Sequence, residues 1–143
     1  MPHWLPRKTV VVPIDFSEDS FAVLDTALEL VDSPAHLHVI HVLPVLEPTE
    51  PGVIWQTIDD RGRSEHAEEA LRAELAKRNH PDVQVVIRFG DPGHEIAHYA
   101  DQVEAGLVVV ASHGRTGLKR LLIGSVADRV VRLAHCPVLV LKR

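Results

Sequence analysis

The chain has 143 residues, of which 45% are hydrophobic and 24% charged, and its formal net charge is −5. This is the composition of one ordinary globular domain with a core of its own, and its mild acidity argues against nucleic acid or a membrane surface as the main partner. The single cysteine, Cys136, excludes an intrachain disulfide and favours a reducing compartment. No apolar run approaches a membrane span and the first residues lack the apolar core of a signal peptide, so we expect a cytoplasmic protein.

Two strands and one helix are predicted in the first part of the chain. The β-branched run of residues 9–14 predicts a buried strand, and Asp15 follows it directly. Ser17 is predicted to be the N-cap of a helix that keeps its apolar period to about Asp32. Acidic residues follow Ser17 in the first turn, where the helix dipole favours carboxylates. Residues 36–42 predict the second strand.

A loop, two helices and a third strand are predicted next. The prolines within residues 44–57 predict a loop, and a long amphipathic helix is expected over residues 59–79. A strand over residues 83–87 leads to Asp91 and Pro92, which predict an N-cap and a proline at the first helical position. This helix is expected to end near Gly106. The predicted apolar face of the long helix is Ala67, Ala70, Leu71 and Leu75.

The last part of the chain predicts strand, helix and strand again. Residues 107–111 form a continuous apolar run that predicts a buried parallel strand. A glycine-punctuated segment then leads to Ser125, the predicted N-cap of the final helix. Pro137 breaks this helix, and residues 138–141 predict the last strand. The predicted apolar stripe of the final helix is Val126, Val130, Val131, Leu133 and Ala134.

Five short apolar strands that alternate with four helical segments predict an α/β fold: a single doubly wound, five-stranded parallel sheet with helices on both faces. In such a sheet, ligands bind outside the carboxyl ends of the strands, where the strand order reverses. We therefore expect a functional site at that edge of the sheet.

The segment between the fourth strand and the final helix predicts an anion site. A strand, a glycine-containing loop and a helix N-terminus together expose backbone N–H groups to a phosphate. Between Ala111 and Ser125 the charged residues are Arg115, Lys119 and Arg120, with no acidic residue. This local positive charge contrasts with the net negative charge of the chain.

The same segment carries a resemblance to a known family. Ala111-x-x-Gly114, nine further residues and Gly124-Ser125 resemble the nucleotide loop of the universal stress proteins, G-x2-G-x9-G-[S/T]. The flanks P-I-D-F-S, G-S-V-A-D-R-V-V-R and H-C-P-V-L-V-L-K resemble the family too, so the resemblance covers essentially the whole chain, residues 1–143, as one universal stress protein domain. One position departs from the pattern: Ala111 replaces the first glycine, and its methyl group would crowd a close backbone approach or a positive φ.

The resemblance implies a fold, a ligand and a partner. It implies strand order 3-2-1-4-5, an ATP-binding stress-response module that regulates or protects, and ATP as cofactor with or without Mg²⁺. It also implies a homodimer through the Val138–Leu141 strand. The residues that match the family's adenosine contacts are Pro13, Ile14, Asp15 and Val42. The phosphate contacts would fall at the loop and helix start, on Ala111, His113, Gly114, Arg115, Gly124, Ser125 and Val126.

Asp15 also has a plainer interpretation, as a turn residue that caps the helix beginning at Ser17. Taken alone, Asp15 favours that structural role. Together with the basic loop after the fourth strand, it favours a carboxylate that accepts hydrogen bonds from an adenine amino group or ribose hydroxyls.

The histidines offer competing metal sites. His94-Glu95-Ile96-Ala97-His98 fits the zinc-protease pattern H-E-x-x-H. However, Ile96 marks the core face of that helix, and both histidines lie about 200° from it at about 100° per residue, so they are expected to face solvent. No third ligand is indicated, and we interpret the match as chance. His36 and His38, predicted to share one strand face, are interpreted as strand-end residues rather than a metal pair.

Three other functions remain open. An ATP hydrolase or phosphotransferase could use the same pocket, although no acidic pair for Mg²⁺ is evident and turnover is expected to be slow or absent. A phospho-receiver is suggested by acids after the first strand, Ser112 and Lys142, but it would need a phospho-accepting aspartate after the third strand, where Asp91 is expected to cap a helix. A family member that binds no nucleotide is the third, and Ala111 keeps it open.

Overall fold

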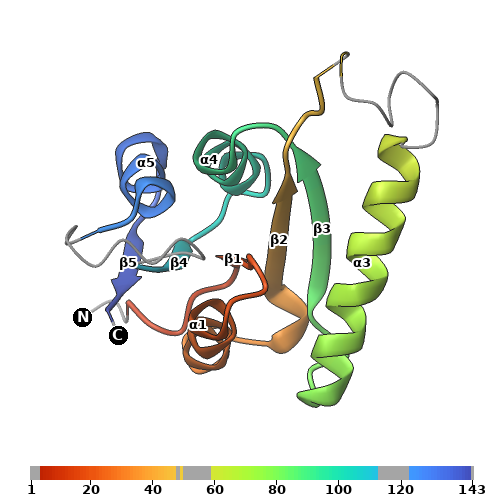
Figure 1. Ribbon diagram of the computed structural model, residues 1–143. Coiled ribbons are helices and arrows are strands. Elements are labelled where there is room, and N and C mark those ends of the chain that lie inside the picture. The colour runs from red at the N-terminus through yellow and green to blue at the C-terminus, as the bar shows by residue number, and fades with distance from the viewer. Residues whose placement is uncertain (1–3, 48, 50–58, 113–122, 143) are drawn as a thin grey trace.

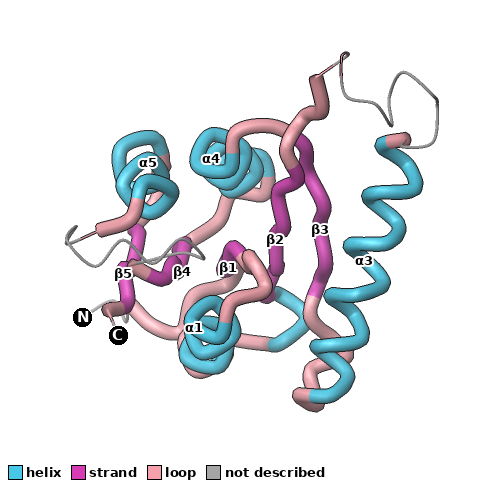
Figure 2. Tube along the Cα trace, viewed as in Figure 1, coloured by secondary structure: helices cyan, strands magenta, loops and turns pink. Residues whose placement is uncertain are grey.

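The computed structural model describes residues 4–47, 49, 59–112 and 123–142. Its centre is a parallel sheet in the order β3-β2-β1-β4-β5, as Figures 1 and 2 show. The predicted α/β fold and the strand order are therefore confirmed. The strands are β1 (Val10–Pro13), β2 (Leu37–Leu43), β3 (Gln84–Phe89), β4 (Leu107–Ala111) and β5 (Val138–Leu141).

Helices cover both faces of the sheet (Figure 1). A short 3-10 turn, η1 (Pro34–His36), precedes β2. One face is covered by α1 (Glu18–Leu28) and α3 (Asp60–Lys77), and the other by α4 (Pro92–Gln102) and α5 (Ser125–Leu133). Among the described ranges, no helix is both long and apolar enough to cross a membrane.

The central strand β1 shows why these residues form a buried sheet. Val10, Val11 and Val12 have no exposed surface. Successive side chains of a strand point to opposite faces, so Val10 and Val12 pack in the core beneath α1 and α3, whereas Val11 packs beneath α4 and α5. Burying one valine side chain contributes about 1.5–3 kcal/mol, and the β-branched run that predicted the strand supplies both cores.

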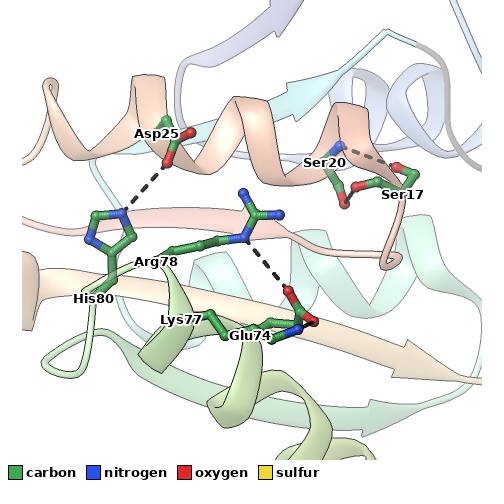
Figure 3. A network of polar contacts seen from close by, with 7 residues as sticks. All are labelled: Ser17, Ser20, Asp25, Glu74, Lys77, Arg78 and His80. Carbon is green, nitrogen blue, oxygen red and sulfur yellow. Dashed lines mark hydrogen bonds and ion pairs between the residues drawn. The ribbon is translucent and has the colours of Figure 1, made fainter.

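Polar contacts join α1 to the end of α3 (Figure 3). His80 Nε2 lies 3.5 Å from Asp25 Oδ1, and the guanidinium of Arg78 lies 4.2 Å from the centre of the Phe21 ring. Arg78 also lies 3.8 Å from Glu74 within α3. The His80–Asp25 and Arg78–Phe21 contacts link the two helices on one face of the sheet.

Two predicted helix starts are confirmed and one is displaced. The Ser17 side chain accepts a hydrogen bond from the Ser20 N–H, and Asp91 caps α4 with Pro92 at its first position. The helix after Ser17 ends at Leu28, before the expected Asp32. The prediction of Ser125 as an N-cap was wrong: Gly124 occupies the cap and Ser125 is the first helical residue.

The predicted apolar faces of α3 and α5 were too wide. In α3, Ala67, Leu71 and Leu75 are buried, but Ala70 is exposed. This helix lies over the edge strand β3, so one narrow i, i+4 row makes its contact. In α5 the row packed in the core is Ala127, Val130 and Ala134. The side chains predicted to be buried there but exposed in the structure are Val126, Val131 and Leu133.

Candidate functional site

The described residues of the predicted site gather at the carboxyl edge of the sheet. Ile14 and Asp15 follow β1, Val42 lies near the end of β2, and Ala111 ends β4. Gly124, the N-cap residue of α5, lies beside the end of β4, because its N–H donates to the carbonyl of Ser112. Pro13, Ser125 and Val126 lie at the same edge, whereas His113, Gly114 and Arg115 lie outside the described residues.

The strand order reverses between β1 and β4, and the two strands part there. Their register pairs Val10 with Leu107 and Val11 with Val108. β1 nevertheless continues to Pro13 and β4 to Ala111. The ladder between β1 and β2, by contrast, extends to Pro13. The carboxyl ends of β1 and β4 are therefore not joined by the ladder at the point where open α/β sheets bind ligands.

Asp15 has the structural role that its position suggested. Its Oδ1 accepts hydrogen bonds from the Ser17 N–H at 2.9 Å and from the Ser17 hydroxyl at 2.5 Å. Phe16, which lies between them, has φ +66°, a backbone conformation that residues other than glycine rarely adopt. The chain thus turns sharply from β1 into α1, and the carboxylate of Asp15 is held at that turn.

The N-terminus of α5 differs from the other described helix starts. Side chains of Ser17, Ser33, Asp59 and Asp91 cap the other helices, but Gly124 has no side chain to offer, and no side chain among the described residues caps α5. The first N–H groups of a helix have no partner within it. Those of α5 lie beside Ser112, which is buried and whose N–H donates to Leu141 O at 2.9 Å.

Arg129 fixes α5 against the start of α4. Its guanidinium lies 2.6 Å from Asp91 Oδ1, and this hydrogen bond holds the pKa of the Asp91 carboxyl below its usual value. A Cβ added to Gly93 would lie only 2.6 Å from the Arg129 side chain, so the glycine provides the space for this contact. Asp91 is thereby engaged by Arg129 and by the His94 N–H at 3.0 Å, which supports its expected capping role.

The residues around Ile14 include a histidine that the sequence analysis missed. His41 Nδ1 lies 2.6 Å from the carbonyl oxygen of Ile14, and its ring meets Phe16 edge to face at 4.9 Å. The available signal was a polar histidine near the carboxyl end of the second strand, directly before Val42.

The other histidines do not form a metal centre in the described part of the chain. No group of three or more His, Cys, Asp or Glu side chains there could hold a metal ion. His36 lies in η1 rather than in a strand and pairs with Asp32 at 2.7 Å. His38 instead contacts the Tyr99 hydroxyl at 2.6 Å, and burial, followed by the nearby His36, lowers the pKa of its imidazole.

A shallow hollow of about 250 Å³ lies away from this edge. Asp101 and Glu104 line it at the end of α4, and His135 and Cys136 line it in the turn before β5. His135 lies 3.2 Å from Asp101, and burial raises the pKa of the Cys136 thiol. Because this turn leads to the amino end of β5, the hollow is not part of the predicted site.

The fold is that of a doubly wound α/β protein, with its topological switch point between β1 and β4, where proteins of this class bind ligands. Residues 6–142 match the universal stress protein family. The chain is 34% identical to universal stress protein MJ0531 of Methanocaldococcus jannaschii over 143 residues, covering 95% of this chain and 82% of that protein. It is 31% identical to universal stress protein YxiE of Bacillus subtilis, and the match covers 93% of this chain and 97% of that protein.

A solved structure of a universal stress protein is similar to this chain as well. Universal stress protein UspA from Lactobacillus plantarum superimposes with a TM-score of 0.73 at 26% identity, covering 94% of this chain and 97% of that one. The chain belongs to the universal stress protein family.

His94 and His98 are exposed on α4, and their rings stack with centroids 6.3 Å apart and planes 6° from parallel. Because both side chains face solvent, replacing both with alanine is expected to change neither the melting temperature by more than a few degrees nor nucleotide binding. Circular dichroism melting and calorimetry test this. Stoichiometric zinc in the purified protein, lost in the double variant together with an activity, would contradict it.

Proposed function

We propose that this universal stress protein binds ATP at the carboxyl ends of β1 and β4 without appreciable turnover, as a regulatory or protective module. The observation that carries the proposal is the parting of these two strands at the switch point. Asp15 lies at one side of it, and at the other lies the N-terminus of α5, which no described side chain caps. Asp15, Ile14, Pro13 and Val42 would serve the adenosine end. The phosphates would lie against Gly124, Ser125, Val126 and the loop that includes His113, Gly114 and Arg115.

Magnitudes show that no single feature suffices. A helix N-terminus favours an anion by about 0.3–1 kcal/mol, and by ~2 kcal/mol when partly buried. A micromolar dissociation constant corresponds to about 8 kcal/mol. The difference has to come from several loop N–H groups, basic side chains and a covered adenine ring. We therefore expect adenosine and phosphate contacts to be needed together.

A protein with this fold supports the choice of an adenine nucleotide. One solved universal stress protein is a complex with cAMP, with a TM-score of 0.63 and 23% identity to this chain. At that identity it shares the fold, and the assignment of ATP to this chain rests on the geometry of its own edge.

Calorimetry with ATP, ADP, AMP and adenosine tests the proposal directly. ATP is expected to bind most tightly, with adenosine retaining part of the affinity. No heat and no competition for any of the four ligands on well-folded protein would identify a family member that does not bind nucleotide. Phosphate release on the order of 1 s⁻¹ or faster would identify a hydrolase instead.

Ala111 is expected to be a tolerated replacement for the glycine of the family pattern. It is the last residue of β4, pairs with Leu141, and is not among the described residues with positive φ. Its methyl group packs against the core. Ala111→Gly is therefore expected to change the ATP dissociation constant by at most about tenfold, or ~1.4 kcal/mol, in calorimetric titrations. A larger gain would mean that the methyl group blocks the phosphates.

We also propose a homodimer through β5, which is the sheet edge next to α5 (Figure 1). An exposed edge offers unpaired N–H and C=O groups to a second strand, and Val126, Val131 and Leu133 add exposed apolar surface on α5.

Val140→Pro is expected to convert this dimer to a monomer. Leu141 O accepts from Ser112 N and Pro137 O from Val108 N, so alternation directs the Val140 N–H away from β4. Proline removes that outward donor without breaking the β4 ladder, whereas Val140→Ala keeps the donor. Sedimentation at tens of micromolar distinguishes the two, and a monomeric wild type would contradict the proposal.

A further inference from the structure

The imidazole of His41 occupies a main-chain acceptor at the end of β1. His41 Nδ1 lies 2.6 Å from Ile14 O. A carbonyl oxygen can only accept, so Nδ1 carries the hydrogen and donates. The half-buried ring lies on the face of the sheet where Phe16 packs, and the two rings meet at 81°. His41 is thus held by one hydrogen bond and one ring contact at the point where the chain leaves β1.

The Ile14 carbonyl is the acceptor at which the hydrogen-bond ladder between β1 and β2 would continue. The last rung of this ladder is the Ile14 N–H bond to Ile40 O at 2.9 Å. In a parallel ladder the same residue's carbonyl would next accept from the N–H two positions further along β2, which is that of Val42. Among the hydrogen bonds between described residues, none joins Val42 N–H to Ile14 O.

The other neighbour of β2 does not take the Val42 N–H. Leu43 O accepts from the Gly90 N–H, so Leu43 directs its backbone groups toward β3. Alternate residues of a strand direct their backbone groups to opposite neighbours, and Val42 therefore directs its N–H and C=O toward β1. Phe16, with φ +66°, has already turned the chain away there. Val42, a half-buried residue, thus directs its backbone groups toward the parted ends of the strands.

We propose that His41 is a positioning residue that keeps the Val42 N–H available to the ligand by taking up the Ile14 carbonyl. This inference rests on the proposed adenine-nucleotide function. An N–H and a C=O on one residue match the adenine edge, where N1 accepts and the N6 amino group donates. Guanine presents the opposite pattern, a donor at N1 and an acceptor at O6, so the same edge selects against it.

The alternative is a histidine that only packs and stabilises the turn. Two substitutions separate these roles. Both remove the ring contact with Phe16, but only one of them keeps a hydrogen-bond donor. His41→Asn keeps a donor, since its Nδ2 lies as many bonds from Cα as the imidazole Nδ1. His41→Val has no donor but suits a strand better than asparagine does. If His41 only packs, the asparagine variant is expected to lose more ligand affinity than the valine variant. If His41 is a positioning residue, the valine variant is expected to lose more.

The binding experiment compares adenosine with 1-deazaadenosine, which lacks the N1 acceptor, by calorimetry on wild type and both variants. Wild type and His41→Asn are expected to prefer adenosine by about five- to tenfold, the range of one net hydrogen bond. His41→Val is expected to lose that preference, because Val42 N–H can then donate to Ile14 O. An equal loss of both ligands in His41→Val, or an unchanged preference, overturns the proposal.

A second measurement needs no ligand and separates the two proposals. The Val42 amide is expected to exchange its hydrogen rapidly in the ligand-free protein and more slowly in His41→Val. If wild type binds no adenosine but the exchange behaves in this way, the nucleotide function fails while the role of His41 in the ladder stands. A Val42 amide as protected in wild type as that of Ile14, or unchanged in His41→Val, overturns the inference.

Discussion

Replacing Gly124 with valine is expected to weaken ATP binding about a hundredfold, or ~2.7 kcal/mol, while leaving adenosine binding unchanged. Gly124 is the N-cap residue of α5 and has φ −70° and ψ 163°, an extended conformation open to any residue. Valine therefore adds bulk without backbone strain, at the helix start where the phosphates are proposed to lie. The hydrogen bond from the Gly124 N–H to Ser112 O involves no side chain and is retained.

Calorimetry with ATP and adenosine on Gly124→Val measures this effect, and Gly124→Ala is the matched control with less bulk. The alanine variant is expected to lose less ATP affinity than the valine variant, and both are expected to melt close to wild type. An equal loss for adenosine would show that the change disturbs the whole site. Unchanged ATP affinity would place the phosphates elsewhere.

Local chemistry made most of the fold predictable. The β-branched run before Asp15 and the caps at Ser17 and Asp91 are local signals, and each element that they predicted is present. The strand order could not be predicted from such local signals. Parallel pairing is decided by contacts between distant segments, such as Val11 with Val108, which no local period encodes. The order therefore came from the family resemblance alone.

Burial on the helices was predicted less well, for a tertiary reason. An apolar side chain is buried only where a neighbouring element covers it, and α5 is rotated so that Ala127 and Val130 pack in the core that it shares with α4. Val126 and Leu133 are left exposed in that rotation. Their sequence pattern indicates an amphipathic helix but not which part of its apolar stripe meets the sheet.

In the candidate site, too, local features could be predicted from the sequence, and features that depend on contacts between distant segments could not. Asp15 and Gly124 could be proposed from the sequence because a turn after a strand and a glycine before a helix are local features. The part that His41 plays depends on the register that sets Pro13 opposite Ile40, because this register places the imidazole beside Ile14 O. A one-residue shift of that register would have directed the ring to the other face of the sheet.

Asp15→Ala is expected to weaken adenosine and ATP alike, by about ten- to hundredfold, the range of a hydrogen bond to a charged group. This loss at the adenosine end contrasts with the loss expected from Gly124→Val, which is confined to ligands with phosphates. Calorimetry with adenosine and ATP on both variants measures the contrast. Because Asp15 Oδ1 also accepts from the Ser17 N–H and hydroxyl, alanine removes a turn contact as well as the proposed ligand contact.

Asp15→Asn separates these two effects. The amide oxygen of asparagine can still accept from the Ser17 N–H, so the turn into α1 is retained, but the negative charge is lost. If Asp15 contacts the nucleoside, the asparagine variant is expected to melt close to wild type and yet bind adenosine weakly. If Asp15 only shapes the turn, the asparagine variant binds as wild type does, and the alanine variant loses melting temperature and affinity together. That second result would remove Asp15 from the site and leave the β4–α5 segment to account for nucleotide binding.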